Sequence, residues 1–345
     1  MVGRRYIACC LVSAAAGMGV LAPAAPASAE VQQGLGSALV HDPFGASSAY
    51  RGEIRAPREF SGIAWLATEE SDEVVQEVFL VCHDTRDNDA EHDLPRLSIV
   101  RTPVDPRGII VEELDVEFPG RSVPNDLESI ARLPGRNGAL LVESNADGTD
   151  PDPMIYLARW DEDLNLEIVS SVPWPETPEP LVNVEATAVV TVRGWDYFVY
   201  AERAEGRDTT NINMTRLVVG ADGADGAIRF GRRWTSVPFT APVPPGARPA
   251  SGMDIDTMGN VYVSSAYDPG DLGPFDSAVY RAATVRAGGG IGARLRPVEP
   301  PQQLARSSGL KVEGVGLVAG SFPIFIGDDD EDYGGLLRQL RVVGE

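Results

Sequence analysis

The segment Leu127-Glu128-Ser129-Ile130-Ala131 is a short apolar stretch opened by an acid, and four other short apolar segments are opened by a small residue or an acid. These are Ser61-Gly62-Ile63-Ala64-Trp65, Val184-Glu185-Ala186-Thr187-Ala188, Ser251-Gly252-Met253-Asp254-Ile255 and Val312-Glu313-Gly314-Val315-Gly316. Counted from the second residue of each segment, the spacings are 66, 57, 67 and 61 residues. A unit repeated at this interval indicates an architecture built from similar modules.

Each opening is followed by further β-branched or aromatic runs with polar loops between them, as in antiparallel strands. Second runs occur at residues 78–81, 139–142, 197–200, 260–263 and 323–326, and third runs at 96–101, 154–160, 215–219, 278–282 and 336–342. A fourth run follows in the first four units, at residues 109–118, 164–172, 228–239 and 293–298. No long stretch has a helical period, so the chain is predicted to be all-β.

Four antiparallel strands repeated about every sixty residues are typical of β-propeller blades, which bury both faces against their neighbours. We therefore expect a single β-propeller of five four-stranded blades. The last unit has three strands, and the apolar residues 35–44 would supply the fourth and close the ring. Two alternatives remain open: a sixth, irregular blade within the Gly/Pro-rich residues 268–310, and a two-sheet sandwich, which does not explain five similar openings.

Residues 1–29 have the features of a signal peptide. Arg4 and Arg5 precede an apolar stretch, and an A-x-A-like cleavage site ends at Ala29. The stretch is short and contains Gly17 and Gly19, which disfavours a membrane helix. We expect residues 30–345 to form the propeller, secreted or extracytoplasmic, in the periplasm or cell envelope, with no membrane span once the signal is removed. The arginine pair leaves both the general and the twin-arginine export routes open.

The composition excludes some partners. The chain has 345 residues, 43% of them apolar, and a formal net charge of −22. Such a charge disfavours nucleic acid and anionic lipid as partners and favours cations, so we expect the protein to bind a divalent cation. We also expect the protein to be a monomer. Only Cys82 remains after the signal, so no internal disulfide forms; because it lies in an apolar run, a buried thiol is favoured over a nucleophile.

Four carboxylates belong to the opening segments: Glu128, Glu185, Asp254 and Glu313. The first strand of a propeller blade lines the central channel, so these acids are expected to converge on one axis. Like charges in a channel raise one another's pKa unless a cation or bound water offsets them, so such a cluster either holds a metal or stays partly protonated. Oxygen ligands favour hard cations, which predicts Ca²⁺ before Mg²⁺ or Mn²⁺, with Asp328 from a rim loop as a further ligand.

An alternative assigns these acids to backbone N–H groups of the neighbouring blade, as clips without any metal. The acidic run at residues 328–332 lacks the spacing of an EF-hand and is expected to be a solvated loop. His83 shares a loop with Asp84 and is a candidate general base or phosphate contact, although a surface position is favoured. Motifs of serine hydrolases, zinc proteases and nucleotide-binding loops are absent from the sequence.

The opening motifs resemble those of exported phytase-like and esterase-like β-propellers and of the related SdiA-regulated propellers. The resemblance rests on the segments at residues 60–65, 125–131, 183–186 and 310–315 and covers most of the mature chain. It implies metal ions on an acidic face, held by Glu128, Glu185 and Glu313. The chain departs from calcium phytases in having a single lysine, Lys311, where those enzymes use several cationic side chains to grip phosphate.

Two functions follow as expectations. The first is a metal-dependent hydrolase of a small anionic phosphate or carboxylic ester, in which Ca²⁺ activates water and Glu185 is the general base. The second is a non-catalytic propeller that binds a protein or a cell-envelope ligand and holds a structural metal.

Overall fold

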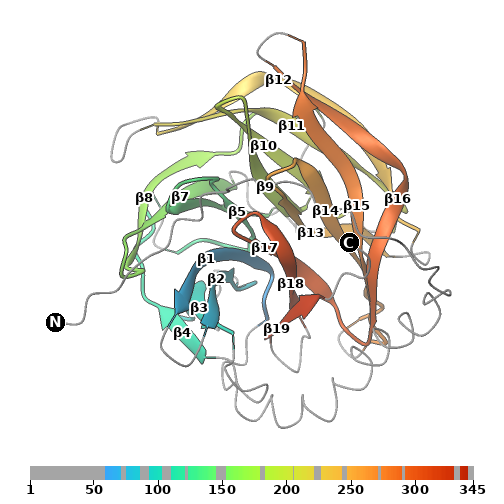
Figure 1. Cartoon of the computed structure of the whole chain (residues 1–345). Helices are drawn as coiled ribbons and strands as arrows, with labels where there is room; N and C mark the ends of the chain where they lie inside the picture. Colours follow the sequence, from blue (N-terminus) through green and yellow to red (C-terminus); the bar gives the residue numbers. More distant parts are fainter. Residues whose placement is uncertain are drawn as a thin grey trace, which may run out of the picture.

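The computed structural model describes residues 59–70, 75–85, 93–102, 110–120, 123–144, 153–178, 183–204, 206–220, 227–242, 247–270, 273–289, 292–329 and 335–340. Within these ranges the regular structure is entirely β: nineteen strands form five antiparallel sheets, four of them four-stranded and one three-stranded. The prediction of an all-β, five-bladed propeller is confirmed (Figure 1).

Each blade is a meander of consecutive strands. Blade 1 contains β1 (Gly62–Glu70), β2 (Val75–Cys82), β3 (Leu97–Arg101) and β4 (Ile110–Leu114). Blade 2 contains β5 (Leu127–Arg132), β6 (Gly138–Glu143), β7 (Met154–Trp160) and β8 (Leu166–Pro173). Blade 3 contains β9 (Val184–Val192), β10 (Trp195–Glu202), β11 (Thr209–Val219) and β12 (Ile228–Thr240). Blade 4 contains β13 (Arg248–Ile255), β14 (Asn260–Tyr267), β15 (Asp276–Ala287) and β16 (Ala293–Ser308), and blade 5 contains β17 (Val312–Val318), β18 (Ser321–Asp329) and β19 (Gly335–Leu340).

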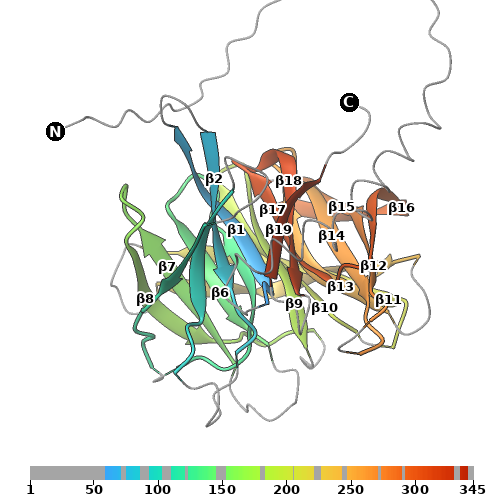
Figure 2. The same ribbon diagram turned by 90° about the horizontal axis from the view of Figure 1, so that it is seen from below.

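The five first strands surround the axis. β1 contacts β5, β5 contacts β9, β9 contacts β13, β13 contacts β17, and β17 contacts β1, which closes the ring. The sheets radiate outward from these strands, and Figure 2 shows them running between the two faces of the ring. Four of the expected opening segments start at a first strand or one residue before it, and the segment at residues 251–255 forms the end of β13. The starts of β1, β5, β9 and β17 therefore share one mouth of the channel.

Burial follows this arrangement. The first strands are buried on both faces, as in β5 and β9, whereas the outermost strands β12 and β16 are largely exposed or half-buried. Apolar clusters fill the gaps between blades: one joins blades 1 and 2, another blades 2 and 3, and a third blades 3 and 4. A fourth packs Phe60 and Phe79 of blade 1 against Leu336 and Leu337 of blade 5. Sheet-to-sheet burial is therefore the main stabilising element of the ring.

The centre of the ring leaves room only for small residues at certain positions. A Cβ on Gly252 of β13 would overlap the carbonyl oxygen of Glu313 in β17. A Cβ on Gly62 of β1 would meet Cα of Ser129 in β5 at 2.9 Å. Glycine at these two positions therefore lets neighbouring first strands approach closely.

The six-bladed alternative is wrong, because residues 268–310 contribute β15 and β16 to blade 4. The expected closing strand at 35–44 and the expected signal at 1–29 lie outside the described residues, and the described part of blade 5 has three strands. The expectation of a buried thiol is confirmed: Cys82 is fully buried and burial raises its pKa. The described residues include no helix long and apolar enough to cross a membrane.

Candidate functional site

Three glutamates occupy equivalent places at the mouth of the channel. Glu128, Glu185 and Glu313 are each the second residue of a first strand, and each falls at a β-bulge. Around Glu128 the partners of Leu127 and Ser129 are the adjacent residues Glu143 and Val142, and the same shift occurs around Glu185 and Glu313. A bulge commonly re-aims a side chain next to a functional site, and the three carboxylates are buried here.

Arg248, at the start of β13, neutralises part of this cluster. Its Nη1 lies 2.6 Å from Oε1 of Glu313 and 3.8 Å from Oε1 of Glu185, and its Nη2 lies 2.6 Å from Oδ2 of Asp268. Lys311 lies 3.4 Å from the same Glu313 oxygen and 3.5 Å from the same Asp268 oxygen. Burial raises the pKa of Asp268, but Arg248 and Lys311 outweigh this effect and lower it. Arg248 and Lys311 therefore hold the Asp268 carboxylate ionised.

Glu185 is held on one side only. Its Oε1 accepts a hydrogen bond of 2.9 Å from Nη1 of Arg203, in addition to the ion pair with Arg248. Its Oε2 is buried and has no hydrogen-bond partner among the described residues. One side-chain oxygen of Glu185 is thus fixed by arginines, while the other remains available to a ligand or a reacting group.

Glu128 lies in the opposite environment. One ligand oxygen from each of Asp84, Asp126 and Glu128 can be chosen so that all three lie within 4.8 Å of one another. Burial raises the pKa of Glu128 well above its usual range, and the neighbouring carboxylates, Asp84 first, raise it further. Oδ1 of Asp126 is buried and has no hydrogen-bond partner among the described residues. This cluster needs a proton or a cation to offset its charge, because three adjacent carboxylates repel one another.

Asp254 does not join this site. It lies six residues beyond Arg248 along β13, past a β-bulge, toward the opposite mouth of the channel. Its Oδ2 accepts a hydrogen bond of 2.8 Å from the backbone N–H of Leu317 in blade 5, and its Oδ1 accepts one of 2.7 Å from Ile255. The structure therefore does not bring Asp254 together with Glu128, Glu185 and Glu313, and its hydrogen bond to blade 5 has the form of the inter-blade clip.

The remaining predicted residues have other surroundings. Asp328 is the Cα partner of Val312 in the β17–β18 ladder, and its side chain lies outside what the structure describes. His83 is only 1% exposed, so the surface position expected for it is wrong. Its Nδ1 is 2.8 Å from the carbonyl oxygen of Glu59 and its Nε2 is 2.7 Å from Oγ of Ser98. Both ring nitrogens therefore have polar partners close to blade 1, and the general-base role of His83 stays a prediction.

Sequence reasoning missed Asp126, Arg248 and Lys311. Asp126 and Lys311 each stand two residues before a bulge glutamate, and Arg248 begins the first strand of blade 4. A signal was therefore present: charged residues immediately upstream of the opening segments reach the same mouth as the segments themselves. Because the prediction considered only the acids, it did not include Arg248 and Lys311, which lie beside Glu313.

No family model matches the chain, and no curated protein matches it. A native arabinanase of Bacillus subtilis, Arb43A, is similar in structure, with 12% identity, 83% of this chain and 95% of that chain covered, and a TM-score of 0.46. An endo-arabinanase of glycoside hydrolase family 43 from Bacillus licheniformis has 13% identity, coverages of 84% and 96%, and a TM-score of 0.47. A β-1,2-mannobiose phosphorylase from Listeria innocua has 10% identity, coverages of 84% and 92%, and a TM-score of 0.44. The resemblance to phytase-like and esterase-like propellers is not confirmed by any of these comparisons.

Proposed function

We propose that the protein is a hydrolase of glycosidic bonds whose working groups are Glu128 and Glu185 at the axial mouth. One observation carries the proposal: two equivalent bulge glutamates have opposite electrostatic environments. Burial and neighbouring acids raise the pKa of Glu128, whereas Glu185 lies 2.9 Å from Arg203 and 3.8 Å from Arg248. A carboxyl group surrounded by acids beside one that contacts two arginines is the kind of pair that acid–base hydrolysis requires.

In this proposal Glu128 is the general acid. Its proton passes to the oxygen of the leaving group as the glycosidic bond breaks. Glu185 acts on the anomeric carbon from the other side, either directly or by removing a proton from the attacking water. Asp84 and Asp126 are positioning residues, because their negative charge keeps the proton on Glu128.

The charge distribution favours a neutral substrate over the anionic esters expected from sequence. Arg203, Arg248 and Lys311 are each engaged by a carboxylate, so an incoming phosphate would have to compete with Glu185, Glu313 and Asp268. The chain as a whole carries a formal charge of −22, which repels anions at long range. An uncharged sugar meets neither obstacle.

Aryl glycosides with different leaving groups test the two roles. Glu128→Gln should lose about 10²–10⁴-fold in kcat on alkyl glycosides, and far less on 2,4-dinitrophenyl glycosides, whose leaving group needs no proton. Glu185→Ala should lose activity on both, and added azide should restore turnover if Glu185 acts as the nucleophile. Glu112→Gln, at an exposed carboxylate on β4, is the matched control. Equal losses for Glu128→Gln on both substrates, or no hydrolysis by the wild type across a panel of glycosides, would reject the proposal.

A second candidate follows from the same carboxylates. Asp84, Asp126 and Glu128 fit a hard divalent cation, Ca²⁺ first, because their ligand oxygens lie within 4.8 Å of one another and one buried oxygen of Asp126 has no hydrogen-bond partner. A bound cation would neutralise the cluster and stabilise the contact between blades 1 and 2. The chain would then be a propeller that binds a ligand around a structural metal.

Thermal melts separate the two candidates. A cation site predicts that Ca²⁺ raises Tm, that EDTA lowers it, and that Asp126→Asn removes both responses. It also predicts that Ca²⁺ inhibits glycoside hydrolysis, since a cation keeps Glu128 ionised and unable to give up a proton. A melt that Ca²⁺ and EDTA leave unchanged would exclude the metal and leave the proton as the compensating charge.

A further inference from the structure

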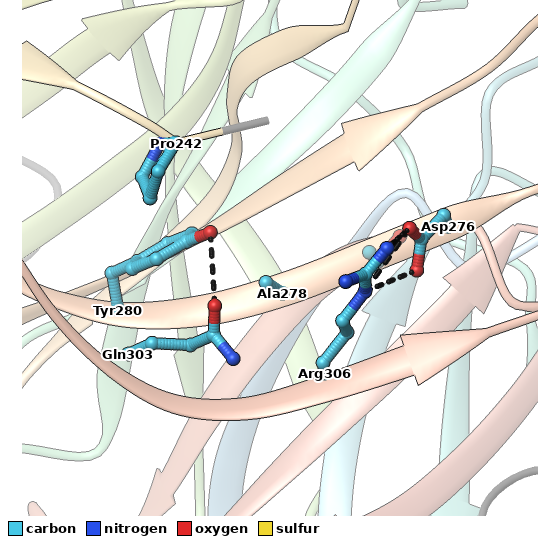
Figure 3. A pocket seen from close by; sticks show the side chains of 7 residues that line it. Pro242, Asp276, Ala278, Tyr280, Gln303 and Arg306 are labelled. Carbon is cyan, nitrogen blue, oxygen red and sulfur yellow. Dashed lines mark hydrogen bonds and ion pairs between the residues drawn. The ribbon is translucent and has the colours of Figure 1, made fainter. Parts of the chain in front are cut away.

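A polar cavity lies away from the axis, between blades 3 and 4. It has a volume of about 310 Å³ and is lined by Pro242, which follows β12, and by residues of β15 and β16 (Figure 3). The β15 and β16 residues that line it are Asp276, Ser277, Ala278, Tyr280, Gln303 and Arg306. Small-molecule sites begin at about 300 Å³, so the cavity has room for one small ligand.

The hollow arises from the two-residue period of a strand. Asp276, Ala278 and Tyr280 alternate along β15 and so point to the same face of the sheet. Ala278 is the smallest of the three, and its Cα partner on β16 is Arg306. Figure 3 shows the side chains of Asp276 and Arg306 on one side of Ala278, and those of Tyr280 and Gln303 on the other. The cavity is therefore a gap over an alanine between two polar pairs.

The first pair is charged but balanced. Nε of Arg306 lies 3.0 and 3.1 Å from the two carboxylate oxygens of Asp276, and Nη2 also contacts Oδ2. The Arg306 side chain is 61% exposed, so its remaining N–H groups face the cavity and solvent. Because Asp276 already neutralises Arg306, the pair has little attraction for an anion and offers donors and acceptors to a neutral group.

The second pair is weakly engaged. The Tyr280 hydroxyl is 3.5 Å from Oε1 of Gln303, longer than the 2.5–3.0 Å usual for an O–H···O hydrogen bond. The contact with Tyr280 uses Oε1 of Gln303, and its amide nitrogen has no hydrogen bond to a described residue, so two donors can reach a ligand. Pro242 supplies an apolar wall opposite Tyr280 (Figure 3).

We infer that this cavity binds a single neutral monosaccharide unit. A sugar ring presents several hydroxyl groups, each a donor and an acceptor, together with apolar C–H faces, and the cavity offers carboxylate, guanidinium, amide and phenol groups beside Pro242. The site is separate from the axial carboxylates, and the inference does not depend on hydrolysis. Its floor is joined to the axial mouth, because Ser277 donates a hydrogen bond of 2.8 Å to the carbonyl oxygen of Leu310 and accepts one of 3.0 Å from Val312, on either side of Lys311.

Saturation-transfer NMR and calorimetry with D-glucose, D-xylose and methyl β-D-glucopyranoside test the inference on the whole protein. At least one of these sugars should bind. Ala278→Leu fills the gap and should abolish binding, while Arg306→Ala and Gln303→Ala should each weaken it about tenfold. Gln302→Ala is the matched control, since Gln302 is exposed on the same strand and points to the other face. Its affinity should stay within twofold of the wild type.

Two further measurements exclude binding at the axial mouth and loss of folding as explanations. The same titrations in a Glu128→Gln background should give unchanged affinity, which separates this cavity from a sugar held at the axis. Near-UV circular dichroism and Tm confirm that each variant is folded. Binding that survives Ala278→Leu, a preference for inorganic phosphate over every sugar, or no binding of any of the three sugars at about 50 mM would overturn the inference.

Discussion

The backbone N–H of Leu317 in blade 5 donates a hydrogen bond of 2.8 Å to the carboxylate of Asp254 in blade 4. A side chain expected to bind metal thus joins two neighbouring sheets. Ser129 makes a comparable contact between blades 2 and 3, since its hydroxyl accepts a hydrogen bond of 3.1 Å from the backbone N–H of Thr187. Hydrogen bonds of this kind are directional and fix the register of neighbouring sheets, whereas apolar packing is non-directional and would let the sheets slide.

Asp254 should make stability depend on pH. Burial raises its pKa to about 6 from an ordinary value of 3.8, against the hydrogen bonds from Leu317 and Ile255 and the charge of Arg132. The folded state therefore binds this proton more tightly than the unfolded state, so the contribution is complete below pH 3.8 and is lost as the pH rises through 6. The free energy of unfolding of the wild type minus that of Asp254→Asn should fall by at most about 3 kcal/mol over this window. Urea unfolding of both proteins at several pH values measures the difference. If the stability of the two proteins changed with pH in parallel, the raised pKa of Asp254 would be contradicted.

Arg248→Met should strongly destabilise the ring. The substitution leaves the buried carboxylates of Glu313 and Asp268 without their main partner, and loss of one member of a buried ion pair costs about 3–5 kcal/mol. Chemical denaturation measures the cost. Arg101→Met is the control, because Arg101 pairs with the partly exposed Glu69 and Glu112 and should lose no more than about 1 kcal/mol. Similar losses in the two variants would show that the axial network is well solvated.

Glu143→Gln should destabilise blade 2 although it preserves shape. The fully buried Glu143 carboxylate accepts hydrogen bonds from the backbone of Asn125 at 2.9 Å, the backbone of Met154 at 2.7 Å and the hydroxyl of Tyr156 at 3.0 Å. The NH₂ group of glutamine would face one of these N–H or O–H donors, so we expect the free energy of unfolding to fall by about 2–3 kcal/mol. Tyr156→Phe removes one of these bonds and should lose about 1 kcal/mol. Thermal and urea unfolding test both, and a larger effect of Tyr156→Phe would contradict the ranking.

Gly252→Ala should disturb the axial site through the backbone. The added methyl group would overlap the carbonyl of Glu313, so β13 and β17 would have to separate. We expect a loss of more than about 2 kcal/mol in unfolding free energy, together with weaker activity at the axial mouth. Gly220→Ala is the control, because its nearest neighbour would lie at an ordinary 3.5 Å. A Gly252→Ala protein as stable as the wild type would mean that the first strands are less tightly packed than described.

The repeat made the architecture predictable because each opening segment has to become a first strand buried on both faces. Val184–Val192, for example, consists mostly of valine, alanine and threonine, which suit a strand buried on both faces. The location of Glu128, Glu185 and Glu313 at one mouth followed from the same register. Asp254 was misplaced because it stands two residues further along its segment than those glutamates do, which moves it along the channel.

The charge balance at the axis could not be predicted from sequence in the same way. Arg248 and Asp268 lie at opposite ends of a two-strand segment, and only the return of β14 beside β13 brings their side chains together at 2.6 Å. His83 shows a similar limit, since its loop position suggested exposure while its contacts with Glu59 and Ser98 bury it. The cavity over Ala278 depends on the pairing of β15 with β16, which no local pattern specifies.

The single lysine of the chain, Lys311, has consequences for covalent labelling. Its ammonium group is buried between Asp268 and Glu313, and its residue is only 3% exposed. Acylating reagents aimed at lysine should therefore leave this residue unmodified until β17 detaches from β13. Mass-spectrometric detection of a modified Lys311 then becomes a built-in reporter of the opening of the axial mouth, against a background free of other lysine signals.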